Sequence, residues 1–256
     1  MFDWLLRQDG VGPEWVRALG DLPGRPGQHI TTQPLRLAAQ TPAALAGAYP
    51  LGAGAALPPD ARPQITEADQ LDRDAWLARH GLADAPLVLF QPGNEKTMRR
   101  GLRRRASNTK GWHEQRRAQV LARVQQRLPV ARLRLCGSPG ERPLAEDIHR
   151  LCGGLRVSIA TDELPIPRLL ALQARAHSMV SIDTGPAHSA AAMGCPLVVL
   201  FAQRRARVLS VPLAGSAPVV TLGPAAEGDD DGTLSISADA VLGAWRQKMS
   251  LRLPGV

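Results

Sequence analysis

The segment Asp183-Thr184-Gly185-Pro186-Ala187-His188 combines residue types that suit phosphate binding at the start of a helix. It follows the apolar run at residues 179–182, which is typical of a strand. Gly185 would let a ligand approach the backbone closely, and Pro186 suits a first helical turn because its missing N–H costs nothing there. Free amides at such a terminus attract phosphate. A plainer interpretation is that Asp183 only caps the helix.

Two other apolar runs also end in loops whose residues could bind a ligand. After residues 87–90 the loop begins Gln91-Pro92-Gly93-Asn94 and ends Lys110-Gly111-Trp112, so a lysine could reach phosphate oxygens. The alternative is a solvated basic loop. After residues 131–136, the loop at residues 137–141 places Glu141 at a helix start. There the helix dipole favours a carboxylate, which could also bind ribose hydroxyls.

These loops belong to an alternating pattern of short apolar runs and helical spacing. We expect strands at residues 87–90, 131–136, 155–159, 179–182, 197–201 and 218–222. We expect helices at residues 67–80, 112–128, 141–152, 165–176, 186–193 and 238–248. The alternation predicts an α/β fold with a mostly parallel sheet covered on both faces. In such sheets ligands bind beyond the carboxyl ends of the strands.

The residues before this pattern show no regular helix or strand periodicity. Gly and Pro recur too often in the first 63 residues for long elements, although residues 34–46 could form one helix. Residues 50–63 have the composition of a linker. We therefore expect a short, incomplete N-terminal segment with its linker at residues 1–85, and a Rossmann-like domain at residues 86–250.

Composition describes a globular protein with one strongly basic segment. The 256 residues are 44% hydrophobic and carry a formal net charge of +8. Nine cations and two glutamates between Glu95 and Arg117 supply +7 of it. The three cysteines form no CxxC, and Cys136 and Cys195 adjoin strand-like runs, which indicates reduced, buried thiols in a cytoplasmic protein rather than disulfides or zinc ligands. The sequence shows no signal-peptide pattern and no 18-residue apolar span.

Taken together, residues 86–248 resemble the C-terminal, donor-binding domain of glycosyltransferase family 9. These are the ADP-heptose:lipopolysaccharide heptosyltransferases and their relatives, with the GT-B fold. The specific stretch is residues 180–201, which is similar to the family's strand, D-T-G-P-x-H-x-A-A-A-x-G-x-P and second strand. Residues 137–141 resemble its G-x-P-x-E loop, and residues 110–112 its K-x-W.

The resemblance implies a glycosyltransferase that transfers a sugar to a lipopolysaccharide-core or related glycan acceptor. In this family the sugar is typically heptose and the donor ADP-heptose. The implied mechanism is inverting and needs no metal or other cofactor. The implied donor-binding residues are Gly93, Asn94, Lys110, Glu141, Leu164, Asp183, Thr184, Gly185 and His188.

Each of these positions takes a role from the motif it matches. Residues 183–185 match contacts to the donor's diphosphate and sugar, and Lys110 matches a phosphate-binding lysine; Gly93 and Asn94 sit where the family places small or hydroxyl residues beside the phosphates. Glu141 matches a carboxylate on the ribose. Leu164 sits where an apolar side chain covers the base. His188 either contacts the donor or orients the loop.

The chain departs from the family before the donor domain. The family opens with a complete acceptor domain whose first strand-to-helix turn carries a Gly-rich loop and an Asp taken as general base. Here about 85 residues precede the donor domain, and only residues 28–37 faintly resemble a late segment of that domain. Asp3, Asp9 and Asp21 lack the strand-turn-helix context, so we assign no catalytic base. A non-catalytic nucleotide-sugar-binding remnant is the alternative function.

The second departure is an insertion at residues 95–109 that contains Arg99-Arg100 and Arg103-Arg104-Arg105. It could clamp the donor diphosphate or a phosphorylated lipid acceptor, or hold the protein peripherally on the anionic inner membrane at ~1 kcal/mol per basic residue. It could also be a solvated loop. Nucleic-acid binding is a further alternative, but we expect no nucleic-acid partner because no aromatic residue lies between Lys96 and Gly111.

Overall fold

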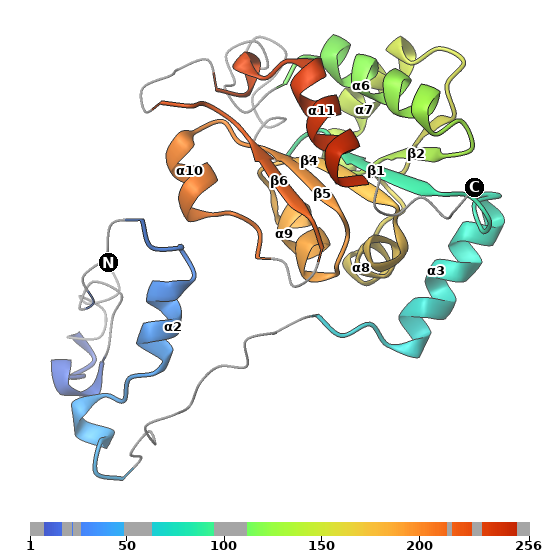
Figure 1. Ribbon diagram of the computed structural model, residues 1–256. Helices are drawn as coiled ribbons and strands as arrows, with labels where there is room; N and C mark the ends of the chain where they lie inside the picture. Colours follow the sequence, from blue (N-terminus) through green and yellow to red (C-terminus); the bar gives the residue numbers. More distant parts are fainter. Residues whose placement is uncertain are drawn as a thin grey trace. The chain divides into compact units, whose positions relative to one another are not determined.

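The computed structural model describes residues 8–16, 22, 27–48, 63–94, 112–213, 217–226 and 232–249 (Figure 1). The chain divides into two compact units. One comprises Met1–Ala61 with Val208–Ser210, and the other comprises Arg62–Arg207 with Val211–Val256.

The described part of the first unit consists of short helices. They are η1 (Pro13–Trp15), α2 (Thr32–Ala38) and η3 (Ala43–Leu45). The expected single helix over residues 34–46 is therefore wrong. The helical pattern is interrupted before Pro42, because a residue that precedes proline is disfavoured in the α conformation.

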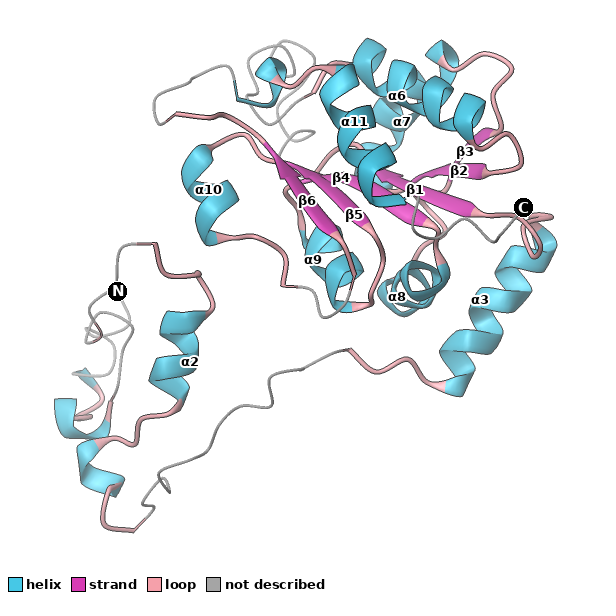
Figure 2. Cartoon of the chain, in the orientation of Figure 1, coloured by secondary structure: helices cyan, strands magenta, loops and turns pink. Residues whose placement is uncertain are grey.

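The second unit is built on a six-stranded sheet, as Figure 2 shows. The strands are β1 (Leu87–Gln91), β2 (Arg132–Leu135), β3 (Val157–Ile159), β4 (Ser178–Ile182), β5 (Leu197–Leu200) and β6 (Val219–Leu222). Their order is β3-β2-β1-β4-β5-β6, and every pair is parallel. The predicted α/β fold with a mostly parallel sheet is confirmed. The order reverses between β1 and β4, which makes that junction the topological switch point.

Helices cover both faces of the sheet. The expected helices correspond to α3 (Glu67–Arg79), α6 (Glu114–Arg127), α7 (Arg142–Leu151), α8 (Ile166–Arg175), α9 (Gly185–Ala192) and α11 (Ala238–Met249). Side chains alternate along β1, so Val88 and Phe90 pack with α6, α7 and α11. Leu87 and Leu89 face the opposite layer, where α3, α8 and α9 pack. The short α10 (Arg204–Leu209) was not expected, because six residues give too little periodicity to recognise.

Helix α3 belongs to the second unit, although we expected residues 67–80 to precede the domain boundary. Thr66 caps it in a capping box with Asp69, and Gly81, with φ +62°, follows its end. Trp76 and Leu77 are buried in the core below the sheet face that α8 and α9 also cover. The compact unit accordingly begins at residue 62, earlier than the boundary at residue 86. Contacts of buried side chains, which the linker-like composition of residues 50–63 does not reveal, set this limit.

Candidate functional site

Three predicted loops meet at one edge of the sheet. They follow β1, β2 and β4, which are direct neighbours in the sheet and parallel to one another. Their carboxyl ends therefore lie side by side at the switch point, where a parallel α/β sheet binds its ligands. The structure thus brings Gly93, Asn94 and Glu141 to the same edge as residues 183–185.

Glu141 is buried at this edge, with 4% of its surface exposed. Its Oε2 accepts hydrogen bonds from the backbone N of Ser138 at 2.8 Å and from the Ser138 hydroxyl at 2.9 Å. Its Oε1 accepts one from Nε2 of Gln91 at 3.1 Å. A carboxylate has about four lone-pair sites, so three are used within the protein. Among the residues that the structure describes, no fourth donor to this carboxylate is seen.

Gln91 is a site residue that the sequence analysis missed. It is the last residue of β1 and is 3% exposed. Its Nε2 donates both to Glu141 and, at 2.9 Å, to the carbonyl oxygen of Gly93. This one amide therefore fixes the loop after β1 against the loop after β2. A glutamine at the end of an otherwise apolar run was the available signal.

Gly137 lets the Glu141 carboxylate fold back on its own loop. Its φ of +154° is a backbone conformation that side chains with a Cβ rarely adopt. A Cβ at this position would lie 3.2 Å from Cβ of Glu141 and 3.3 Å from its Oε2. A glycine is therefore required here by both the backbone and the packing.

The loop after β4 leads directly into α9. The N-cap residue is Thr184, with φ −150° and ψ 167°, and its side chain makes no capping hydrogen bond. Its hydroxyl instead donates to the carbonyl oxygen of Ile182 at 3.3 Å. The plainer interpretation of Asp183 as the N-cap is therefore wrong. In the first turn of α9, Pro186 has no N–H and the Ala187 N–H donates to the carbonyl oxygen of Thr184 at 3.0 Å. The Gly185 N–H is therefore the amide of this turn that can face a ligand at the edge where Asp183 also lies.

Asp183 and His188 face one another across this turn. Nε2 of His188 lies 4.0 Å from Oδ1 of Asp183. The Asp183 side chain is 17% exposed and the His188 side chain 43% exposed. This separation allows an electrostatic attraction but is too long for a hydrogen bond between these two atoms, and the His188 side chain is still reached from solvent. Its exposure is compatible with contact to a donor, and its role in orienting the loop stays a prediction.

Gly185 is not required by the fold. Its backbone lies outside the left-handed region, and a Cβ placed on it would meet no atom within 4 Å. The open space lies at the first residue of α9. A side chain here would project into the room that a phosphate at the helix terminus needs.

The first turn of α9 is held from α8 by a second residue that the sequence analysis missed. Gln173 is fully buried, and its Nε2 donates to the carbonyl oxygen of Pro186 at 2.9 Å. Its Oε1 accepts from the hydroxyl of Ser189 at 2.8 Å. The same hydroxyl also lies 3.1 Å from the carbonyl oxygen of Pro186. A glutamine on the apolar face of residues 166–175 was the signal.

Leu164 lies half-buried in the loop after β3, packed against the core that α3 and α8 share. Its neighbour Glu163 accepts a hydrogen bond from Nε1 of Trp76 at 2.8 Å and contacts Nε2 of His80 at 3.0 Å. The contacts anchor this loop to α3. Leu164 is therefore placed at the same sheet edge by a fixed loop.

A bidentate ion pair strengthens the same attachment. Arg168 donates from Nε and Nη2 to the two carboxylate oxygens of Asp72, each at 2.7 Å. Its Nη1 donates to the carbonyl oxygen of Glu163 at 2.6 Å. The hydrogen bond from Arg168 lowers the pKa of Asp72. Helix α3 therefore acts as a brace for the loop that holds Leu164.

Several predicted features lie outside the described residues. They are Lys110, the arginine cluster Arg99–Arg105, Asp3 and Asp21. Asp9 is described and lies exposed in the first unit, away from any strand-turn-helix. The described segments contain no group of three or more His, Cys, Asp or Glu side chains placed to hold a metal ion.

The cysteines are free and buried, as expected. Cys136 lies directly after β2, and burial raises the pKa of its thiol to about 12. Among the helices of the described segments, none combines the length and apolarity that a membrane crossing needs.

Comparison with known proteins agrees with this architecture. The family model of glycosyltransferase family 9 (heptosyltransferase) matches residues 28–228. A glycosyl transferase family 9 structure from Veillonella parvula is similar with a TM-score of 0.69, at 19% identity over 88% of this chain and 60% of that one. The E. coli ADP-heptose lps heptosyltransferase II is similar with a TM-score of 0.57, at 20% identity over 74% of this chain and 54% of that one.

The chain thus spans between half and two thirds of the length of these two structures. At such identities the likeness establishes the fold, which is that of GT-B glycosyltransferases. The comparison with curated proteins gave no match.

Proposed function

The chain belongs to glycosyltransferase family 9 (heptosyltransferase), and from this premise we propose that it binds a nucleotide-sugar donor and transfers its sugar to a glycan acceptor. We propose ADP-heptose as the donor and a lipopolysaccharide-core or related glycolipid as the acceptor. The family assignment and the resemblance to the E. coli enzyme's fold support this choice. The protein would then work on the cytoplasmic side of the inner membrane.

The observation that carries the proposal is the start of α9 at the switch point. Asp183 and Thr184 follow β4 there, Gly185 begins α9, and open space surrounds the position of a Cβ on Gly185. Helix-terminal amides and positive side chains stabilise a leaving diphosphate as negative charge develops on it. This electrostatic support lets the bond to the anomeric carbon break without a metal, which is the mechanism we propose.

The other residues complete a donor site around that terminus. Glu141 would accept a hydrogen bond from a ribose hydroxyl, and Leu164 would cover the base. Gly93 and Asn94 would lie beside the phosphates, and Lys110 would bind their oxygens. In an inverting transfer the acceptor hydroxyl attacks the anomeric carbon opposite the departing diphosphate and gives its proton to a base. We assign that base to the acceptor side, and to no residue of the second unit.

We also propose two partners for the arginine cluster. Arg99–Arg105 would clamp phosphate groups or contact the anionic inner leaflet, and nucleic acid is not among the expected partners. A donor-binding protein without transfer is the second candidate. It differs from the first only in the acceptor half of the reaction.

Calorimetry with ADP-, UDP- and GDP-sugars tests the donor site, and a transfer assay with a heptose-deficient core acceptor tests the reaction. Asp183→Ala and Gly185→Val are expected to abolish binding while the fold survives. Asp84→Ala, an exposed carboxylate just before β1, is the matched control and is expected to bind normally. Unchanged affinity in both site variants would remove this loop from the site, whereas binding without transfer would select the second candidate.

A further inference from the structure

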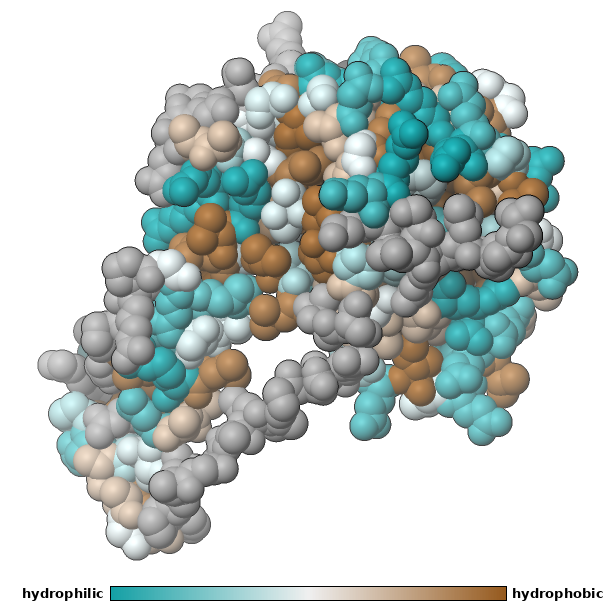
Figure 3. Space-filling model, in the orientation of Figure 1, coloured by the Kyte–Doolittle hydropathy of each residue, from teal (hydrophilic) through white to brown (hydrophobic). Residues whose placement is uncertain are grey.

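A groove lined by arginines lies between α6 and α11, on the face of the sheet that these helices cover. It has a volume of roughly 450 Å³, within the range of small-molecule sites. Its lining residues are Arg123, Gln126, Arg127, Asp239, Leu242, Gly243, Trp245 and Arg246. Figure 3 shows hydrophilic side chains gathered over this side of the unit.

The groove is remote from the donor loops. The starts of the two helices lie together, because Nε1 of Trp112 donates to the carbonyl oxygen of Ile236 at 2.8 Å. Farther along α11, Nε1 of Trp245 donates to the hydroxyl of Ser178 at 3.0 Å. Ser178 is the first residue of β4, so this part of α11 lies at the amino edge of the sheet. The donor loops lie at the carboxyl edge.

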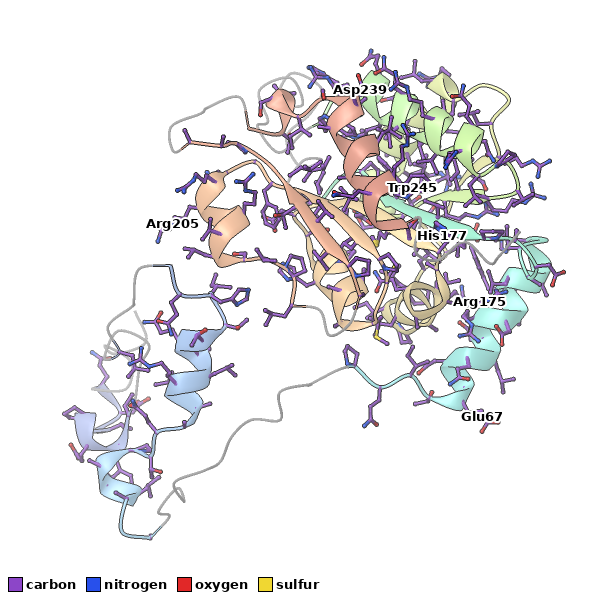
Figure 4. All side chains as sticks on the ribbon, viewed as in Figure 1. Glu67, Arg175, His177, Arg205, Asp239 and Trp245 are labelled. Carbon is purple, nitrogen blue, oxygen red and sulfur yellow. The ribbon has the colours of Figure 1, made fainter. Side chains whose placement is uncertain are left out.

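Helical spacing turns the charged residues of both helices toward the groove. Arg123 and Arg127 are one turn apart on α6, and Asp239 and Arg246 lie two turns apart on α11 (Figure 4 labels Asp239 and Trp245). Asp239 pairs with Arg123. Among the residues that the structure describes, no carboxylate pairs with Arg127 or Arg246. Three arginines and one aspartate leave two positive charges in the groove.

Gly243 keeps the groove open. It lies in the interior of α11, where glycine is less stable than alanine. Its backbone does not adopt a positive φ, and a Cβ on it would meet no atom within 4 Å. Neither backbone geometry nor packing explains a glycine here. The buried side chains of Leu242 and Trp245 form an apolar wall beside the space it leaves.

We propose that this groove binds a phosphate group carried on a small organic body. Arg127 and Arg246 would bind the phosphate oxygens, since guanidinium groups pair with phosphate through two parallel hydrogen bonds. The space at Gly243 would take the carbon skeleton. The phosphate belongs either to a free metabolite or to a lipid headgroup, and the site is separate from the donor site of the proposed function.

The test uses the full chain with glycerol 3-phosphate as the soluble probe and with vesicles of phosphatidylcholine, with or without phosphatidylglycerol. The double variant Arg127→Gln/Arg246→Gln removes both unpaired guanidinium groups. Arg150→Gln/Arg205→Gln removes the same charge from exposed positions elsewhere in the second unit and is the matched control. Gly243→Leu fills the space without changing any charge. Thermal unfolding of each variant verifies the fold.

We expect the wild type and the control to bind glycerol 3-phosphate. The double variant and Gly243→Leu are expected to lose affinity by about tenfold or more. In the two-dimensional NMR spectrum, the Gly243 amide and the Trp245 indole N–H are expected to shift on titration. Vesicle binding that the double variant loses and the control keeps identifies a lipid headgroup. A double variant that loses only the soluble probe, with vesicle binding equal to that of the wild type, identifies a metabolite.

Equal binding of both probes by the wild type and the double variant would overturn the proposal, as would no binding by the wild type. Nucleotide-sugar affinity serves as the independent measurement. It is expected to be unchanged in the groove variants and lost in Asp183→Ala. A failure of the groove is thereby distinguished from a failure of the donor site.

Discussion

Nε2 of Gln91 lies 3.1 Å from Oε1 of Glu141 and joins the carboxyl ends of β1 and β2. The two residues are separated by 50 positions in the chain. Because the Glu141 carboxylate also accepts two bonds from Ser138, the loop after β2 is fixed from both sides. The edge that would hold a donor ribose is therefore formed before any ligand binds.

Replacing Gln91 by leucine is expected to damage both the fold and the site. Oε1 of Glu141 would stay buried without its partner, which costs ~1–3 kcal/mol of the free energy of unfolding. The loop at Gly93 would also lose its anchor, so nucleotide-sugar affinity should fall. Urea unfolding and calorimetry measure the two effects. Gln126→Leu, an exposed glutamine on α6, is the control, and equal stability of the two variants would contradict the prediction.

Gly137→Ala is expected to destabilise the second unit. Alanine would be strained at φ +154°, and its Cβ would press against Glu141 at 3.2 Å. Backbone strain of this kind costs ~1–3 kcal/mol. Gly140→Ala is the matched control in the same loop, because its φ is not positive and the nearest atom to its Cβ is 3.9 Å away. Chemical denaturation compares the pair. Similar midpoints for both variants would show that the loop adapts.

Gln173→Leu is expected to weaken donor binding although Gln173 is a positioning residue that would not touch the donor. The variant removes the bonds to the carbonyl oxygen of Pro186 and to Ser189, so the first turn of α9 loses its attachment to α8. Ser189→Ala removes one of the two bonds and should have the smaller effect. Calorimetry at a temperature where both variants are folded is the measurement. An affinity equal to that of the wild type in Gln173→Leu would show that α9 needs no such support.

The strands and helices of the second unit were largely predictable, because their apolar runs and helical spacing are local signals. The position of the donor loops followed from one rule about parallel sheets, and the motif at residues 180–201 gave the family. Local patterns could not reveal Gln91 or Gln173, since their partners lie on other elements and only the assembled sheet brings them together. The groove between α6 and α11 escaped for the same reason, because its arginines come from helices more than 100 residues apart.

The expected helix over residues 34–46 shows where local signals mislead. Helix-forming residues surround Pro42, but the proline disfavours helix at the residue before it and divides the segment into α2 and η3. The packing of α3 against the rest of the second unit could not be predicted from local sequence either. Its capping box was visible in the sequence, whereas its contacts with Glu163 and Arg168 depend on the completed fold.

Cys136 is expected to make the stability of the protein depend on pH in the alkaline range. Burial raises the pKa of its thiol from 9.0 to about 12 in the folded protein. Below pH 9 the thiol is protonated in both states, and its contribution to stability is fully present. Between pH 9 and 12 the unfolded chain ionises at this residue while the folded protein does not, so the free energy of unfolding falls by up to ~1.4 kcal/mol per pH unit.

Cys136→Ala lacks this contribution. Urea unfolding of both proteins from pH 8 to pH 10.5 should therefore show a steeper decline for the wild type, whatever the constant difference caused by the smaller side chain. Parallel pH profiles would mean that the thiol ionises equally readily in both states, and that it is less deeply enclosed beside β2 than the structure places it.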